Sequence, residues 1–248
     1  MTTEDRLNIK AGAKNQVWTH FSFYILLTIL WIALTWIGNM ISNQNSVSVM
    51  QSIAAGHQVN VTTGGSALAG VFSIVASMLQ SGSQLTMIDI DRGTATLDNP
   101  MQRTFKLFEK SQYFWGWLWI SILTFIMVFL WTLLLVIPGI VKAYAYSQAF
   151  YIYRDALDKG QPISALEAIT QSRQLMDGSK GFLFIMDLSY IGWFILSALF
   201  MNIPDLFVMP YFYTAKAKFY NQLLVKKAGN HEPSHPDDPD EDDHVSIS

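Results

Sequence analysis

The chain has 248 residues, of which 51% are hydrophobic and only 14% are charged. A soluble domain of average composition carries about a quarter charged residues, so this deficit favours a membrane protein. The absence of cysteine excludes disulfides, thiolate metal sites and a cysteine nucleophile.

Charge is divided unevenly along the chain. The net charge of -3 combines 16 Lys and Arg residues, all of them before residue 228, with an acidic segment at residues 228–248. That segment is proline-containing and almost free of apolar residues, so we expect it to be a disordered acidic tail in the cytoplasm. No basic stripe with interleaved aromatic residues lies outside the apolar segments, and nucleic acid is therefore not expected as a partner.

The first apolar run predicts a membrane-spanning helix at residues 20–41, preceded by a cytoplasmic N-terminal segment at residues 1–19. A cleaved signal peptide is the alternative, but its apolar region normally has about 7–15 residues and ends near a small-residue cleavage site. The run here is longer, and the nearest small residues, at 54–56, lie well past its end. Residues 41–64 are polar and uncharged, so we expect an external loop that could hold a short helix or strand.

A stripe of small residues marks the second expected span, at residues 65–88. Small side chains recur at every fourth position, which places them on one side of a helix. They are Gly65, Ala69, Ser73, Ser77 and Ser81. Because close backbone approach drives helix association in lipid, we expect this span to be buried inside a bundle, with a soluble helix as the alternative. The charged residues 89–112 are expected to form a water-exposed connection.

Residues 113–153 form the longest apolar run, with Lys142 as the only charge. As one helix, this run would be about 60 Å long, twice the hydrocarbon thickness of about 30 Å. We therefore expect it to fold back at Pro138, which disfavours helix for the preceding residue, and Gly139, which allows a positive φ. A proline kink within one tilted helix is the alternative.

The hairpin gives two spans, at residues 113–137 and 140–154. Lys142 is expected to extend its amine toward the external headgroups. The returning span ends in tyrosines and Arg154, which is typical of the cytoplasmic interface. Asp155 and Lys159 are four residues apart and are expected to form an ordinary pair on a helix surface.

A short amphipathic helix is expected at residues 164–177, on the cytoplasmic surface of the membrane or under the bundle. Ser164 and Glu167 have the spacing of a capping box, and Gly178 is a natural C-terminal stop. A solvated connector is the alternative. The expected apolar face consists of Ile163, Leu166, Ile169 and Met176.

Two further spans are expected at residues 181–201 and 205–223. Asp187 is an acid inside the first of them, and ionisable residues within the membrane are costly and functional by default. We expect Asp187 to pair with a lysine such as Lys216 on the last span or to reach interfacial water. A role in ion or proton passage is the alternative.

The basic residues test this arrangement. With six spans and a cytoplasmic N-terminus, 15 of the 16 Lys and Arg residues fall on the cytoplasmic side, and only Lys142 lies at the outer hairpin. Basic residues gather on the cytoplasmic side of membrane proteins, so the count supports both the orientation and the reversal near Pro138.

Catalytic signatures are missing. The chain has no GxxxxGK loop, no HExxH helix and no GxSxG elbow. Its five histidines are scattered, and those in the acidic tail lack anything that fixes a coordination geometry. We therefore predict no catalytic residue, no cofactor and no metal site.

Several ordered motifs resemble a bacterial integral-membrane family catalogued as domain of unknown function 975. The resemblance covers about residues 65–222. The matching motifs are I-P-G-I at 137–140, Tyr146 and Asp155, A-I-x-x-S-x-x-x-M-x-G-x-K at 168–180, I-G-W at 191–193, P-Y at 210–211 and F-Y at 219–220. The resemblance implies a multi-pass protein of the bacterial plasma membrane and no established reaction.

The sequence therefore predicts an all-α fold, a polytopic bundle of about six transmembrane helices with one short cytoplasmic amphipathic helix. The expected function is a non-enzymatic interaction or accessory role in the cell envelope. Its partners would be membrane lipids and a membrane protein or a second copy of the chain. A small-solute or ion transporter is the alternative, and a membrane enzyme is the third hypothesis. The structural and candidate functional residues are Pro138, Gly139, Lys142, Asp155, Ser164, Glu167, Arg173, Gly178, Lys180, Asp187, Trp193, Pro210 and Tyr211.

Overall fold

The computed structural model describes residues 1–54 and 63–229, and the described residues are helical without a strand. The expected all-α class is confirmed. The acidic tail lies outside the described residues, apart from its first two positions. The helices are α1 (Thr3–Thr19), α2 (Phe21–Ala54), α3 (Thr63–Asp91), α4 (Pro100–Thr104), the 3-10 helix η1 (Lys106–Phe108), α5 (Ser111–Leu134), α6 (Val136–Tyr146), α7 (Ala149–Asp158), α8 (Ala165–Leu175), α9 (Lys180–Leu188), α10 (Ile191–Leu199) and α11 (Asp205–Gly229).

Helix α1 occupies the N-terminal segment, for which the sequence analysis predicted no element. Thr2 and Asp5 form a capping box, in which each side chain satisfies a free amide of the first turn. Ile9, Ala13 and Val17 recur at every fourth position and are buried, and α1 packs along α11 through this stripe. The apolar stripe of α1 contains only these three residues, so the hydropathy of the segment does not indicate a helix.

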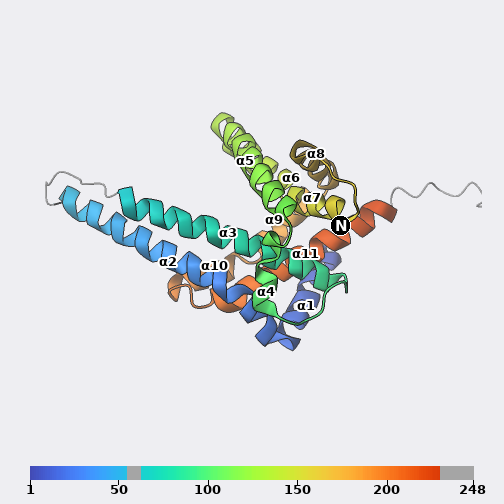
Figure 1. Ribbon diagram of the computed structural model, residues 1–248, viewed down its shortest axis with the longest axis horizontal. Coiled ribbons are helices and arrows are strands. Elements are labelled where there is room, and N and C mark those ends of the chain that lie inside the picture. The colour runs from blue at the N-terminus through green and yellow to red at the C-terminus, as the bar shows by residue number, and fades with distance from the viewer. Residues whose placement is uncertain (55–62, 230–248) are drawn as a thin grey trace, which may run out of the picture.

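Helices α2 and α3 run side by side and project from the body as a long arm (Figure 1). The segment expected to be a loop with room for a short helix is continuous helix at residues 41–54, because α2 continues to Ala54, while residues 55–62 lie outside the described residues. A side chain at Gly38 would meet Phe72 at 3.3 Å and the carbonyl of Ala69 at 3.4 Å, so small residues do permit a close approach here. The prediction that this span is buried inside a bundle is only partly right, since residues 67–75 of α3 are largely exposed.

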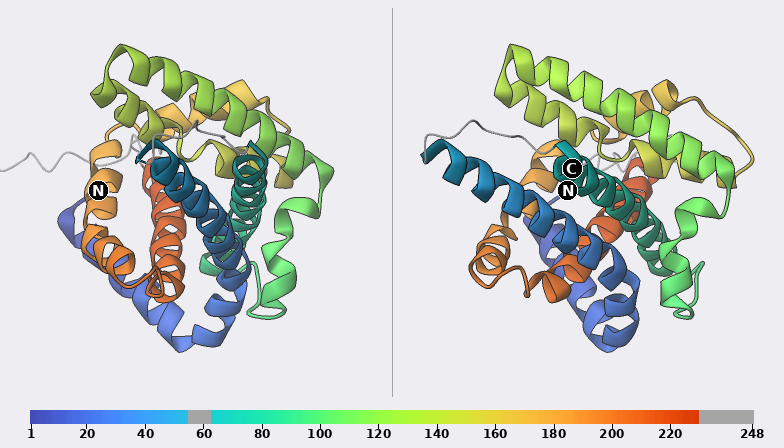
Figure 2. Two further views of the ribbon diagram at one scale, coloured as in Figure 1. Left: turned by 90° about the vertical axis from the view of Figure 1, so that its left-hand side faces the viewer. Right: turned by 60° about the vertical axis from the view of Figure 1, so that its left-hand side comes forward.

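The apolar run at residues 113–153 folds back on itself, as predicted. Helices α5 and α6 form a hairpin that leaves the body in a different direction from the α2–α3 arm (Figures 1 and 2). The corner is Leu135, which is extended with φ −158° and ψ 134°. Pro138 lies in the first turn of α6, where its missing N–H costs nothing.

The predicted reason for Gly139 is wrong. Among the described glycines, positive φ occurs at Gly93, Gly160 and Gly178, and not at Gly139. Gly139 is needed for close helix packing instead, because a Cβ there would lie 2.2 Å from Thr132 Oγ1 and 2.9 Å from Thr132 Cα on α5. The glycine lets the two arms of the hairpin touch.

Among residues 1–54 and 63–229, four helical segments are long and apolar enough to cross a membrane by length and composition: Phe21–Gln44, Ala67–Asp91, Ser111–Leu134 and Lys180–Leu199. The expected span at 140–154 is divided by a turn between α6 and α7, and the expected span at 205–223 lies in α11, which carries Lys216 and Lys218. Neither is among the four, so the predicted count of about six spans is not confirmed.

Helix α11 is the centre of the packing. One side of α11 contacts α1 and α9 through Phe219 and Leu223, and another contacts α2 and α3 through Ala217 and Tyr220. Pro210 is accommodated inside the helix and is buried. Figure 2 shows α11 surrounded by the other helices. The polar clusters described next both include a side chain of α11.

Candidate functional site

A buried arginine organises the first polar cluster. Arg154 of α7 is 2% exposed, and its Nη1 lies 2.5 Å from Asp89 Oδ1 at the end of α3. Its Nε lies 3.1 Å from Asp155 Oδ1, and Asp89 also pairs with Lys106. A buried charge is tolerated only when it is paired and hydrogen-bonded, so this cluster holds α3, α7 and η1 together. We call it the Arg154 network.

Asp155 extends the network to α11. Its carboxylate accepts two hydrogen bonds from Arg92, at 3.0 and 2.7 Å, and a third from the Tyr220 hydroxyl at 2.8 Å. The predicted pair with Lys159 is therefore wrong. A four-residue spacing on one helix cannot reveal Arg92 and Tyr220, which lie about 65 residues before and after Asp155 in the chain. Burial lowers the pKa of Arg92, but the Asp155 carboxylate outweighs this effect and raises it, so the guanidinium of Arg92 stays charged.

Asp158 closes the network at the start of α5, where it accepts hydrogen bonds from Tyr113 and from Lys110. Burial raises the pKa of the Asp158 carboxyl, but those hydrogen bonds and the charges of Arg154 and Lys110 outweigh it, so the pKa lies below its ordinary value. Gly116 permits the close contact of α5 with α7, because a Cβ there would overlap the Tyr153 ring at 1.9 Å.

A seam of polar pairs continues from this network between α3, α7 and α11. Gln80 donates to the Tyr213 hydroxyl, and the Tyr151 hydroxyl donates to Gln84 one turn further along α3. The sequence analysis gave these glutamines no partner. Gln80 and Gln84 are four residues apart in an apolar segment, a spacing that places both on one face of a helix and could have indicated that this face is buried.

Asp187 forms the second cluster. The predicted pairing with Lys216 is confirmed, with Lys216 Nζ 3.2 Å from Asp187 Oδ2, and the Tyr144 hydroxyl donates to the same oxygen at 3.1 Å. Lys10 of α1 lies nearby, where it donates to Ser189 Oγ at 3.0 Å in the turn between α9 and α10. Asp187 is therefore neutralised by its own chain.

Three of the predicted site residues have local roles. Ser164 caps α8 by accepting from the Glu167 amide at 3.2 Å, but the Glu167 side chain accepts from Gln171 instead of the Ser164 amide, so only half of the predicted capping box forms. Gly178 has φ +73° after the helix, as expected of a C-terminal stop. The Lys142 amine lies 4.7 Å from the centre of the Trp131 ring, on the other arm of the hairpin. The expected apolar face of α8 is wrong at Leu166, which is 58% exposed, while Ala168, Ile169 and Ser172 form the buried face.

The predicted residues do not converge on one site. Arg173 is exposed, and Lys180 pairs with Asp177 at 3.0 Å. Trp193 and Tyr211 line one cavity of about 290 Å³, with Pro210 beside them in the chain. Asp155 lines a different cavity of about 570 Å³ between α7, α8 and α11. The described residues contain no group of three or more His, Asp or Glu arranged to hold a metal ion.

The model of the family described as "Protein of unknown function (DUF975)" matches residues 132–227. The match confirms the resemblance and contains every candidate residue from Pro138 to Tyr211, but it begins later than the expected residue 65. No curated protein and no solved structure matches the chain.

Proposed function

We propose that this chain, which carries a DUF975 region at residues 132–227, is a non-enzymatic, multi-pass protein of a bacterial plasma membrane. It acts through contacts of its helices with lipid and with another membrane protein. The gathering of 15 of the 16 basic residues on one side of the expected six-span arrangement supports a cytoplasmic location for both termini.

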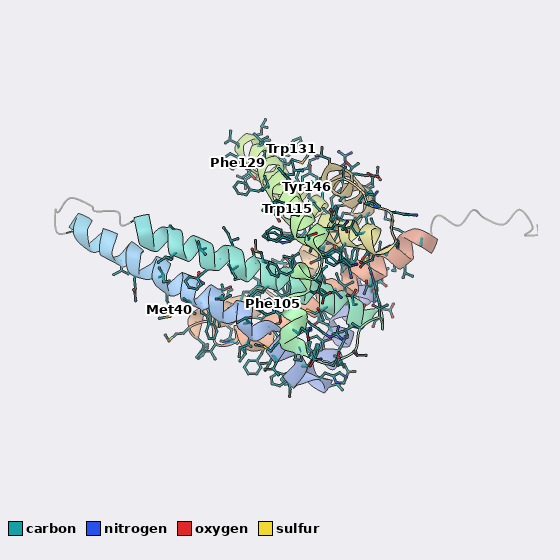
Figure 3. The ribbon with its side chains drawn as sticks, in the orientation of Figure 1. Met40, Phe105, Trp115, Phe129, Trp131 and Tyr146 are labelled. Carbon is teal, nitrogen blue, oxygen red and sulfur yellow. The ribbon has the colours of Figure 1, made fainter. Side chains whose placement is uncertain are left out.

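The exposed face of α5 carries this proposal. Only 6% of its apolar window is buried, against 22% to 44% in the other three candidate spans. Trp115, Phe125 and Phe129 are each more than half exposed, and Figure 3 shows Trp115 and Phe129 along this helix. Soluble proteins rarely expose apolar patches of this extent, whereas a membrane helix presents such a face to lipid or to another helix.

The tip of the α5–α6 hairpin extends the same surface. Five consecutive residues, 133–137, are apolar and between 63% and 76% exposed. In water such an exposed apolar tip would favour aggregation, whereas in a bilayer the same side chains contact lipid hydrocarbon favourably. The hairpin is therefore the element best suited to lateral contacts.

The ionisable groups of both polar clusters support a structural role. Arg154 of α7 pairs with Asp89 of α3, Asp155 of α7 pairs with Arg92 just after α3, and Asp187 pairs with Lys216 of α11. A catalytic or transported-ion site needs polar groups that remain available to a substrate. Asp187 therefore gives the transport alternative no support of its own.

Transport of a small solute or an ion remains the second candidate, and the seam at Gln80 and Gln84 is the observation that favours it. Polar pairs within a membrane bundle can line a solute path. The Gln80→Leu and Gln84→Leu changes would abolish flux across reconstituted vesicles if the seam conducts. Equal flux in vesicles with and without the protein would remove this candidate.

Photocross-linking tests the leading proposal. Benzoyl-phenylalanine is placed at Phe129, on the exposed face of α5, and at Tyr146, an aromatic position of α6 that is 4% exposed. We expect illumination of intact membranes to join position 129, but not position 146, to lipid or to a second protein. Cross-links that are equally frequent at both positions would contradict the proposal.

A further inference from the structure

A basic stripe runs along α1. Arg6, Lys10 and Lys14 are spaced four residues apart, which places them on one side of the helix, beside the buried stripe that packs on α11. Within the described part of the chain, none of the three forms an ion pair. The helix has two acids in its first turn, Glu4 and Asp5, and Asp5 lies on another side and pairs with Lys226 at 2.6 Å. The stripe therefore carries positive charge that the chain does not neutralise.

The middle member of the stripe is held against the turn between α9 and α10. Lys10 Nζ donates to Ser189 Oγ at 3.0 Å and lies 4.6 Å from the centre of the Tyr190 ring. Burial lowers the pKa of Lys10, and the charge of Arg6 lowers it further. An anion bound along the stripe would remove this repulsion.

The stripe ends at an aromatic cavity of about 290 Å³. Lys14, Trp18 and Phe21 line one wall, where α1 meets α2, and Trp193, Phe207 and Tyr211 of α10 and α11 line the other. The rings of Trp18 and Phe21 stack at 5.4 Å, and those of Phe21 and Phe207 stack at 5.6 Å. The cavity thus joins a cationic rim to an apolar interior.

The position of the cavity identifies its surroundings. Phe21 begins the candidate span Phe21–Gln44, so this wall of the cavity lies where a candidate membrane helix starts. Trp and Tyr side chains gather where the acyl region of a bilayer meets its headgroups, and Lys and Arg nearby attract anionic lipid. Acyl chains are therefore the apolar molecules that such a cavity meets.

We infer that α1 and the aromatic cavity form a binding site for one anionic phospholipid. The phosphate lies at Lys14 and Lys10, and an acyl chain enters between Trp18, Trp193 and Phe207. The site lies away from the α5–α6 hairpin, so it goes beyond the proposed function and stands or falls separately from the cross-linking result.

Native mass spectrometry of the full chain in mild detergent tests the site. Phosphatidylglycerol and phosphatidylcholine with identical acyl chains are added at equal concentration. We expect preferential retention of phosphatidylglycerol. The double change Lys10→Gln and Lys14→Gln should weaken its binding roughly 30-fold, as expected from about tenfold for each 1.4 kcal/mol and the usual contribution of a lysine near anionic lipid.

Two controls separate charge, cavity and folding. The exposed pair Lys159→Gln and Arg173→Gln removes the same charge elsewhere and should leave retention unchanged. Trp193→Ala removes the half-exposed indole ring from the cavity wall. It should weaken binding of phosphatidylglycerol but not of soluble glycerol phosphate. Trp193→Ala also keeps the test decisive if the double lysine variant does not fold.

Three results would overturn the inference. They are equal retention of the two lipids, a double lysine variant that folds and binds like the parent, and glycerol phosphate that competes as well as the intact lipid. The last result would assign a phosphate site without an acyl chain, and the cavity would then have no part in binding.

Discussion

At the scale of single residues, Arg154 is the side chain on which most of the polar contacts depend. It is almost fully buried and is shared by Asp89, Asp155 and Asp158, which come from α3 and from α7 itself. Removing one partner of a buried ion pair leaves an uncompensated charge, which costs far more than the pair itself contributes.

We therefore expect Arg154→Gln to destabilise the protein by about 3–5 kcal/mol, measured as unfolding in detergent. Arg173→Gln removes an exposed arginine from α8 and serves as the control, with little effect. Adding Asp89→Asn to Arg154→Gln should restore part of the loss. If Arg154→Gln were as stable as the control, the network would not hold the helices together.

Asp158 predicts how stability changes with pH. Because its folded pKa is depressed, its contribution is fully present above the unfolded value of about 3.9 and is lost as pH falls through the lower folded pKa. Asp158→Asn should thus destabilise the chain at pH 7 by about 1 kcal/mol, since the side chain is partly exposed. The difference from the parent in thermal unfolding should shrink progressively below about pH 4. A difference that does not change with pH would contradict this assignment.

The partners of single residues were predictable only where the sequence limited the choice. Asp187 was an acid in an apolar span with few lysines within reach, and its pairing with Lys216 is confirmed. Asp155 had a lysine four residues away, and that local pattern misled, because the fold brings Arg92 and Tyr220 closer. Partners that are distant in sequence need a fold before they can be assigned.

At the scale of elements, the α5–α6 hairpin followed from a length argument. An apolar run too long for the bilayer had to reverse, and Pro138 marked the region of the reversal to within about three residues. Helix α1 and the second half of α2 were missed for a physical reason. The uncharged polar residues at 41–54 carry no apolar pattern, so hydropathy and propensity alone do not reveal that α2 continues to Ala54.

Close packing at Gly139 gives a prediction for the hairpin. Gly139→Ala should destabilise it by about 1–3 kcal/mol, because the added methyl meets the backbone Cα of Thr132, which cannot rotate away. Gly181→Ala in α9 is the matched control, since nothing lies within 4 Å of its Cβ and alanine favours helix. Thermal unfolding of the two variants decides the matter, and a Gly139→Ala protein as stable as Gly181→Ala would refute the packing account.

At the scale of the whole molecule, two apolar hairpins leave a body that is held together by α11 and the Arg154 network (Figures 1 and 2). Composition predicted the membrane class, and the positive-inside pattern predicts the orientation. The exact number of crossings could not be derived in this way, because α6, α7, α9 and α10 are short helices separated by turns that hydropathy does not resolve.

The central claim is that the exposed face of α5 lies inside the bilayer while the end of α7 lies in the cytoplasm. The chain has no cysteine, so Phe129→Cys and Lys159→Cys each supply a single thiol. In sealed inside-out vesicles, an impermeant maleimide should label Lys159→Cys at once and Phe129→Cys only after denaturation in sodium dodecyl sulfate. Labelling of Phe129→Cys in intact vesicles at the rate of Lys159→Cys would contradict the account.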